Sequence, residues 1–205
     1  MRQFKSEVAK IKNDVLKEIA KLTFESKLEE EIDGLPRSLI ESSINYYRCC
    51  VYKERAIVAE RAKFALGFSS KELNGGERLG DIVKNNLKEH EITAPVLDII
   101  DIACDRCPIH KFLVTDACRG CVAHYCVNSC VKDAITIIGR KAYIDQDKCI
   151  ECGLCSRSCQ FHAIVEVHRP CERSCPTNAI KPGPKRNSII DRSNCTSCGV
   201  CINAC

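Results

Sequence analysis

The residues of this chain that could do chemistry are its cysteines, which number 18 among 205 residues. Two runs share one spacing, in which three cysteines follow one another at every third position and a fourth comes four residues later. These runs are Cys149, Cys152, Cys155 and Cys159, and Cys195, Cys198, Cys201 and Cys205. Three thiolates on so tight a loop can wrap three metal atoms of one cluster, whereas the fourth begins a short segment that points away from it.

This spacing matches the bacterial ferredoxin run for [4Fe-4S] clusters, in which the fourth cysteine binds the neighbouring cluster. Zinc sites need only four ligands, usually as two separated pairs. The five histidines of the chain share no spacing with the cysteines. We therefore expect iron–sulfur clusters at the two regular runs.

A third run, at 118–130, has a longer middle gap but the same overall pattern. If it exchanges its fourth cysteine with the run at 149–159, two complete clusters result. The first would take Cys118, Cys121, Cys126 and Cys159, and the second would take Cys149, Cys152, Cys155 and Cys130. His124 lies inside the longer gap, where it could tune the first cluster by hydrogen bonding.

Four further cysteines form two half-motifs, Cys104-x2-Cys107 and Cys171-x3-Cys175. Combined with the last run they give two more sets of four. One set is Cys195, Cys198, Cys201 and Cys175, and the other is Cys104, Cys107, Cys171 and Cys205. Sixteen cysteines would then hold four clusters. The alternative is a zinc site or free thiols at Cys104, Cys107 and Cys171, which leaves three clusters.

Two cysteines, Cys49 and Cys50, stand outside this scheme. Neighbouring residues on a helix point about 100° apart, so they chelate one metal poorly. We expect both to be small buried hydrophobic residues.

The elements around the cysteine runs repeat as well. Ile-Asp-x3-Cys precedes both regular runs, and Cys-x3-Ala-Ile occurs at Cys130, Cys159 and Cys175. The segment 134–144 predicts a strand, a Gly139-Arg140 turn and a second strand. The corresponding hairpin further on would carry an exposed basic loop at 181–186. Residues 103–205 are therefore expected to form ferredoxin-like tandem [4Fe-4S] modules with small β-hairpins.

Residues 1–102 are predicted to be helical, which makes the fold class α+β with domains at 1–102 and 103–205. The first helix carries an apolar stripe and should end at Asp33-Gly34 and Pro36. A second helix is expected at about 44–66, closed by Gly67, and a third at 79–87 after a turn at 74–76. Residues 96–102 form a candidate strand. The stripe consists of Phe4, Val8, Ile11, Val15, Ile19 and Leu22.

Composition excludes several other classes of protein. The net charge of +4 and the aromatic fraction of 5% are weak support for nucleic-acid binding, and a basic surplus can compensate negatively charged clusters. No window of 18 apolar residues predicts a membrane span. The first 15 residues are charged throughout, unlike a secretory signal. We expect a cytoplasmic protein whose thiols bind metal instead of forming disulfides.

Three stretches resemble the electron-relay region of a subgroup of monomeric iron-only ([FeFe]) hydrogenases. They are TDACRGCVAHYCVNSC at 115–130, YIDQDKCIECGLCSRSC at 143–159 and RPCERSCPTNAI at 169–180. The stretch RCCVYKERAIVAERAKFALG at 48–67 is similar to the N-terminal helical part of the same family.

The resemblance implies an anaerobic oxidoreductase that interconverts protons and hydrogen. This part of it would connect the active site to a soluble ferredoxin. Nothing here matches the cysteine motifs of the family's catalytic domain, and the repeat predicts further residues after Cys205. The chain is therefore expected to be a C-terminally truncated fragment that holds no catalytic residue. The alternative is an electron-transfer subunit of another anaerobic oxidoreductase.

Overall fold

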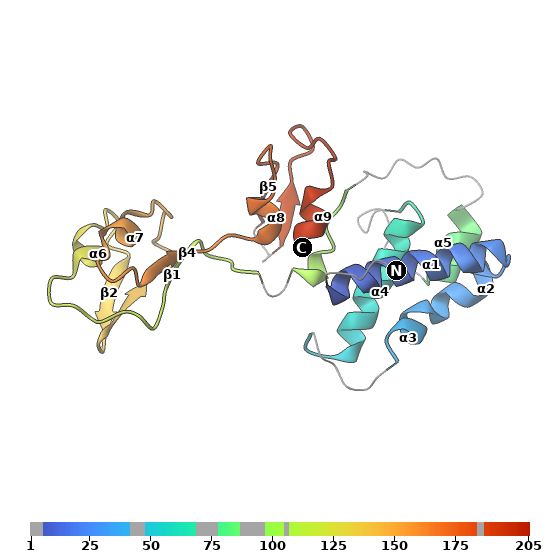
Figure 1. Cartoon of the computed structure of the whole chain (residues 1–205), viewed down its shortest axis with the longest axis horizontal. Helices are drawn as coiled ribbons and strands as arrows, with labels where there is room; N and C mark the ends of the chain where they lie inside the picture. Colours follow the sequence, from blue (N-terminus) through green and yellow to red (C-terminus); the bar gives the residue numbers. More distant parts are fainter. Residues whose placement is uncertain (1–5, 42–47, 69–77, 87–96, 105–106, 184–186) are drawn as a thin grey trace. The chain divides into compact units, whose positions relative to one another are not determined.

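The computed structural model describes residues 6–41, 48–68, 78–86, 97–104, 107–183 and 187–205. It divides into two compact units, Met1–Asp105 with Asn187–Gly199, and Arg106–Arg186 with Val200–Cys205. The first unit is mostly helical, and the second combines short helices with antiparallel strands (Figure 1). The fold class is therefore mixed α+β. Among the described residues no helix is both long and apolar enough to cross a membrane.

The first unit is built from five helices, two 3-10 turns and one strand among its described residues. They are α1 (Glu7–Phe24), α2 (Leu28–Glu31), η1 (Ile32–Gly34), α3 (Leu35–Leu39), α4 (Val51–Ala65), α5 (Leu79–Asn86), η2 (Asp101–Ala103) and β6 (Ser188–Ile190).

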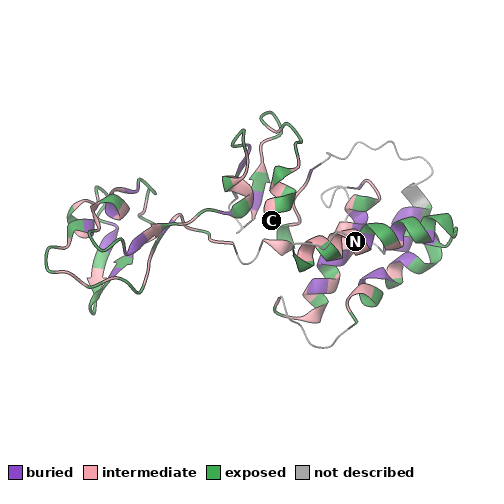
Figure 2. Ribbon diagram, in the orientation of Figure 1, coloured by how far each residue is buried: buried purple, intermediate pink, exposed green. Residues whose placement is uncertain are grey.

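Helix α1 is capped by Ser6, whose Oγ accepts a hydrogen bond from the Ala9 amide at 3.2 Å. The apolar stripe faces inward as its spacing predicts, and three of its residues are buried (Figure 2). These residues, Val15, Ile19 and Leu22, share one apolar core with Val58 and Ala62 of α4. The Phe4 end of the stripe lies outside the described residues.

The prediction that α1 runs to Asp33-Gly34 is wrong, because the helix ends at Phe24. Ser26 takes a left-handed conformation (φ 58°), and the Lys27 amide donates back to the Leu22 carbonyl at 2.9 Å. This hydrogen bond closes a Schellman-type cap without a glycine to signal it in the sequence. Pro36 lies in the first turn of α3 and therefore begins a helix instead of ending one.

Helix α4 begins later than the expected residue 44, since residues 48–50 are not helical and 42–47 lie outside the described residues. Its predicted end is confirmed: Gly67 is left-handed (φ 89°), and the Phe68 amide donates to the Lys63 carbonyl at 3.0 Å. Helix α5 confirms the third predicted helix. The turn expected at 74–76 lies outside the described residues.

The strand predicted at 96–102 is wrong over its described part, which ends in the 3-10 turn η2. The backbone of this segment is hydrogen-bonded by the side chain of Arg192 instead of by a neighbouring strand. The Arg192 guanidinium donates to the Leu97 carbonyl and pairs with the Asp98 carboxylate at 3.0 Å. These contacts hold the segment in an irregular conformation.

The second unit has two antiparallel strand pairs. The predicted hairpin is confirmed as β2 (Ile135–Ile138) and β3 (Lys141–Ile144), with Ile135 opposite Ile144. Strand β1 (Phe112–Val114) pairs with β4 (Ile164–Glu166), 50 residues further on at the Val114–Ile164 pair. The other elements are α6 (Tyr125–Asn128), α7 (Leu154–Ser158), α8 (Pro170–Arg173), β5 (Ile180–Pro182) and α9 (Val200–Ala204). Residues 184–186 of the expected basic loop lie outside the described residues.

The core of the second unit is small, and two of its members are cysteines. It comprises Phe112, Cys126, Ile135, Ala142, Ile144, Cys155 and Ile164. So few apolar side chains supply little hydrophobic stabilisation on their own.

Substitutions at two neighbouring residues of α1 test which face of the helix packs into the core. Val15 is 1% exposed and Leu16 is 57% exposed. We predict that Val15→Ala lowers the free energy of unfolding of the helical unit by about 2 kcal/mol because it leaves a cavity. Leu16→Ala should change it by no more than about 0.5 kcal/mol. Urea unfolding followed by helical circular dichroism measures both, and equal losses would contradict the observed packing of α1.

Candidate metal centre

Each cysteine run bends at the same backbone positions. The second residue after the first cysteine is left-handed in all three runs, with φ 55° at Gly120, 56° at Glu151 and 55° at Ser197. The residue two before the third cysteine is left-handed as well, with φ 46° at His124 and 76° at both Gly153 and Gly199. Glycine tolerates this conformation at no steric cost, whereas the other side chains adopt it only where the surrounding structure requires it. The run with the longer gap therefore forms a loop of the same type as the regular runs.

The repeated Cys-x3-Ala-Ile segment directs a backbone amide at a sulfur. The Ala134, Ala163 and Ala179 amides donate to Sγ of Cys130, Cys159 and Cys175 at 3.3, 3.4 and 3.3 Å. Each alanine is only 1% exposed, so a larger side chain does not fit. The residue before each alanine is left-handed, which turns the amide toward the sulfur. Amides aimed at a thiolate stabilise its negative charge and tune a metal group bound to it.

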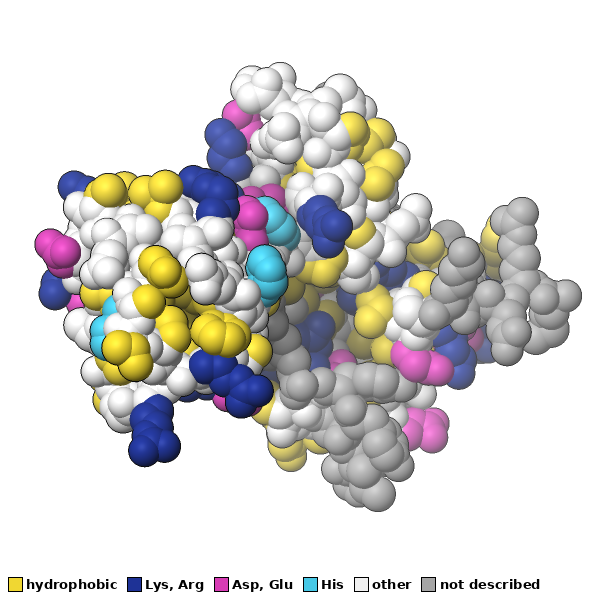
Figure 3. All heavy atoms as spheres, turned by 60° about the vertical axis from the view of Figure 1, so that its left-hand side comes forward, with side chains coloured by type: hydrophobic (Ala, Val, Ile, Leu, Met, Phe, Trp, Pro, Cys, Tyr) yellow, Lys and Arg dark blue, Asp and Glu magenta, His cyan; other side chains and the backbone are white. Residues whose placement is uncertain are grey.

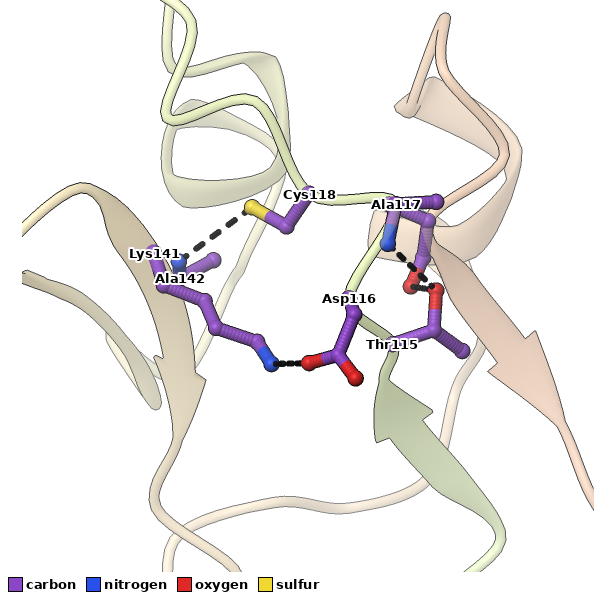
Figure 4. Close-up of polar contacts among 7 residues, drawn as sticks. Thr115, Asp116, Ala117, Cys118, Lys141 and Ala142 are labelled. Carbon is purple, nitrogen blue, oxygen red and sulfur yellow. Dashed lines mark hydrogen bonds and ion pairs between the residues drawn. The ribbon is translucent and has the colours of Figure 1, made fainter.

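The first run is attached to the β2–β3 hairpin, as Figure 4 shows. The Ala142 amide donates to Cys118 Sγ at 3.4 Å, and Lys141 Nζ pairs with the Asp116 carboxylate at 2.6 Å. The Thr115 hydroxyl accepts from the Ala117 amide at 3.4 Å and donates to the Ala163 carbonyl at 3.0 Å. These contacts hold the start of the run between two strands.

A cavity that is partly open to solvent is lined by cysteines from two runs. Cys118, Cys121 and Cys126 come from the first run and Cys159 from the next. His124, Ile137 and Phe161 also line it.

A second cavity has the reciprocal composition. Cys149, Cys152 and Cys155 line it together with Cys130 of the earlier run. The two runs cross beside α6 and α7, where the hydroxyls of Ser129 and Ser158 lie 2.9 Å apart. Each serine directly precedes the cysteine that reaches the other run's cavity. The structure thus brings together the two sets of four cysteines expected from the spacing.

Three thiols of each set act on one another electrostatically. Burial, together with the charges of Cys159 and Cys121, raises the pKa of Cys126. Burial, with the charges of Cys149 and Cys152, likewise raises the pKa of Cys155. Binding of a metal group by these thiolates therefore has to displace protons.

The donor set fits an iron–sulfur cluster. In each cavity four thiols from two runs line one space, and no carboxylate or second type of ligand is needed to complete the set. Thiolate ligands are those that iron–sulfur clusters use.

The remaining two expected sets are divided between the units. Cys104, Cys195 and Cys198 belong to the helical unit, and Cys107, Cys171, Cys175, Cys201 and Cys205 belong to the other. Within the second unit, α8 packs against α9. Burial and the charges of Cys171 and Cys175 raise the pKa of Cys201, so these three thiols are neighbours. The composition of these two sets remains a prediction.

The expectation for Cys49 and Cys50 is wrong. Cys49 is exposed and Cys50 is only half-buried, because both precede α4 instead of lying within it. Sequence reasoning also missed the roles of Thr115, Gly120 and the three buried alanines. The repeated Cys-x3-Ala-Ile segment was the available signal for the alanines.

Apolar side chains reach the surface around the two cavities. Val122 is 97% exposed, and Val131, Tyr125, Ile150 and Phe161 are also exposed. The part of the chain that carries α6 and α7 comes forward in Figure 3, where apolar side chains gather among lysines and arginines.

Comparisons with known proteins agree with this chemistry. The family described as "4Fe-4S binding domain" matches residues 142–165. A ferredoxin of Alicyclobacillus acidocaldarius subsp. acidocaldarius is 40% identical over 55 residues, which are 27% of this chain and 70% of the relative. "Ferredoxin 7Fe" of Hydrogenibacillus schlegelii is 38% identical over 53 residues, which are 26% of this chain and 68% of the relative. No solved structure matches the chain.

Two left-handed glycines form a matched pair of test sites. A Cβ at Gly120 would lie 2.3 Å from the Arg140 carbonyl oxygen, whereas a Cβ at Gly139 would meet nothing within 4 Å. Gly120→Ala should therefore displace the first loop and speed the loss of iron to a chelator. Gly139→Ala carries only the backbone strain, about 1 kcal/mol, and should lose iron at the wild-type rate. Equal rates of iron loss would show that the loop does not depend on this close approach.

The crossing of the two runs can be tested by removing single thiols. Cys159→Ala and Cys118→Ala should perturb the same cluster signal, and Cys130→Ala and Cys149→Ala should perturb the other, because each pair lines one cavity. Electron paramagnetic resonance of the reduced protein distinguishes the two signals. A Cys159→Ala spectrum that matched Cys149→Ala would overturn the crossed arrangement.

Proposed function

Because the chain belongs to the ferredoxin family, we propose that it relays single electrons through up to four [4Fe-4S] clusters. The observation that carries this proposal is the exchange of one cysteine between two cavities, each lined by four thiols. Bound [4Fe-4S] clusters supply reversible one-electron storage at potentials that depend on charge, hydrogen bonds and exposure.

The residues around the cavities have distinct tasks. Cys118, Cys121, Cys126 and Cys159 would hold one cluster, and Cys149, Cys152, Cys155 and Cys130 the other. The Ala134 and Ala163 amides would stabilise the two exchanged thiolates. Phe112 and Ile144 at the second cavity, and Ile137 and Phe161 at the first, would limit the access of water.

We extend the same scheme to the last eight cysteines. One cluster would be held by Cys195, Cys198, Cys201 and Cys175, and another by Cys104, Cys107, Cys171 and Cys205. The charges of Cys171 and Cys175 both act on Cys201, so thiols of the two sets lie close together. In this scheme residues 103–205 form the cluster domain and residues 1–102 a helical domain.

The resemblance of 115–130, 143–159 and 169–180 to iron-only hydrogenases supports a more specific role. We propose that the chain is the electron relay of such an enzyme, whose catalytic domain would be a further domain and whose redox partner would be a soluble ferredoxin. The second candidate is a relay subunit of another anaerobic oxidoreductase. The coding sequence after Cys205 distinguishes them: cysteine motifs for an active-site cluster would support the hydrogenase, and a stop codon would exclude a fused catalytic domain.

Metal analysis tests the number of clusters. We expect about 16 iron and 16 sulfide per chain after anaerobic preparation, since four clusters hold four of each. The visible absorbance should bleach on reduction and return on reoxidation. A double variant, Cys104→Ala with Cys107→Ala, should lose about four iron and keep the other clusters. Zinc in place of iron would contradict the proposal. A wild-type content of about 12 iron per chain would show that the cluster assigned to Cys104, Cys107, Cys171 and Cys205 does not form.

A further inference from the structure

Two cysteines remain that the cluster scheme does not use. Cys49 and Cys50 directly precede α4, and their Sγ atoms lie 3.8 Å apart. Cys49 is exposed and Cys50 is half-buried, so small molecules in solution can reach the pair.

The start of α4 makes the two thiols unequal. Cys50 is the N-cap of this 15-residue helix and has an extended backbone (φ −162°). Interactions with the Lys53 amide and with the Cys49 thiol lower the pKa of Cys50 against the opposing effect of burial. The Tyr52 amide and the Lys53 charge act in the same direction. Cys50 is therefore the better nucleophile of the pair, since the thiolate is the reactive form.

An accessible thiolate beside a second thiol is the arrangement found in redox-sensing cysteines. We propose that Cys49 and Cys50 form a peroxide-sensitive dithiol, in which Cys50 is oxidised first and Cys49 resolves the product. The oxidant is hydrogen peroxide or another small hydroperoxide.

The reaction balances without any further reagent. The Cys50 thiolate sulfur attacks one peroxide oxygen, so that an S–O bond forms and the O–O bond breaks. The product is a sulfenic acid on Cys50 and a hydroxide ion. The Cys49 sulfur then attacks the Cys50 sulfur, forming the S–S bond and breaking the S–O bond, and the second oxygen leaves as water with the Cys49 proton. The proton lost earlier from Cys50 converts the hydroxide to water, and the two sulfurs have given up two electrons.

The resulting disulfide is easily reversed. Adjacent Cα atoms lie about 3.8 Å apart across a trans peptide, which is shorter than the roughly 4.4–6.8 Å usual for disulfides. Strained and exposed disulfides have high reduction potentials and are readily reduced by thiols. The pair is thus suited to a reversible response, not to permanent cross-linking.

Digestion with trypsin isolates the pair, because Arg48 and Lys53 bound a peptide with these two cysteines and no others. The cluster-loaded protein is treated anaerobically with one equivalent of hydrogen peroxide, unfolded, alkylated with iodoacetamide and digested. We expect the 49–53 peptide to be unalkylated and two hydrogens lighter, and to take up two alkyl groups if dithiothreitol precedes alkylation. Visible absorbance records in parallel that the clusters remain intact.

Two variants separate the roles of the sulfurs. Cys49→Ser should stop at a sulfenic acid on Cys50, which dimedone captures. Cys50→Ser removes the thiol with the lowered pKa, so oxidation at Cys49 should be roughly tenfold slower. The proposal is overturned if the pair stays reduced while the clusters are lost, if both variants react at equal rates, or if Cys50 forms a disulfide with a cysteine other than Cys49.

Discussion

A four-iron cluster needs four thiolates around it, and a tight loop with a cysteine at every third position supplies only three. The fourth has to come from elsewhere in the chain, and in this protein each cavity is lined by one cysteine of the neighbouring run. The pairing of β1 with β4 and the packing of α6 against α7 bring the end of one run to the loop of the other. The crossed arrangement therefore organises the part of the second unit that runs from β1 to β4.

The cysteine runs share one local backbone conformation. A left-handed residue bends each loop, another precedes the third cysteine, and an amide of a buried alanine caps the sulfur of the exchanged cysteine. The apolar core between the cavities has only seven members, two of them cysteines, whereas the helical unit has its own core of twelve apolar residues. We infer that bound clusters complete the core of the second unit and that the apolar core around α1 and α4 does not depend on them.

Much of the site could be predicted from the sequence, because cysteine spacing reflects the reach of a short loop. The expected grouping of Cys118, Cys121, Cys126 and Cys159 is the one that surrounds the first cavity, although their role as cluster ligands is a proposal. The β2–β3 hairpin and the buried face of α1 also follow from simple patterns. The end of α1 could not be predicted, since it depends on a left-handed serine. The strand expected at 96–102 does not form in its described part. The side chain of Arg192, far away in the sequence, hydrogen-bonds the Leu97 carbonyl that a neighbouring strand would otherwise use.

The central claim is that the cysteine-rich unit folds around its clusters. Amide hydrogen exchange of the full chain, loaded and after removal of iron, measures this element by element. We predict that protection in β1–β4 and β2–β3 collapses on removal of iron, whereas protection in α1 and α4 persists. Equal protection of both strand pairs in the loaded and the iron-free chain would contradict the claim.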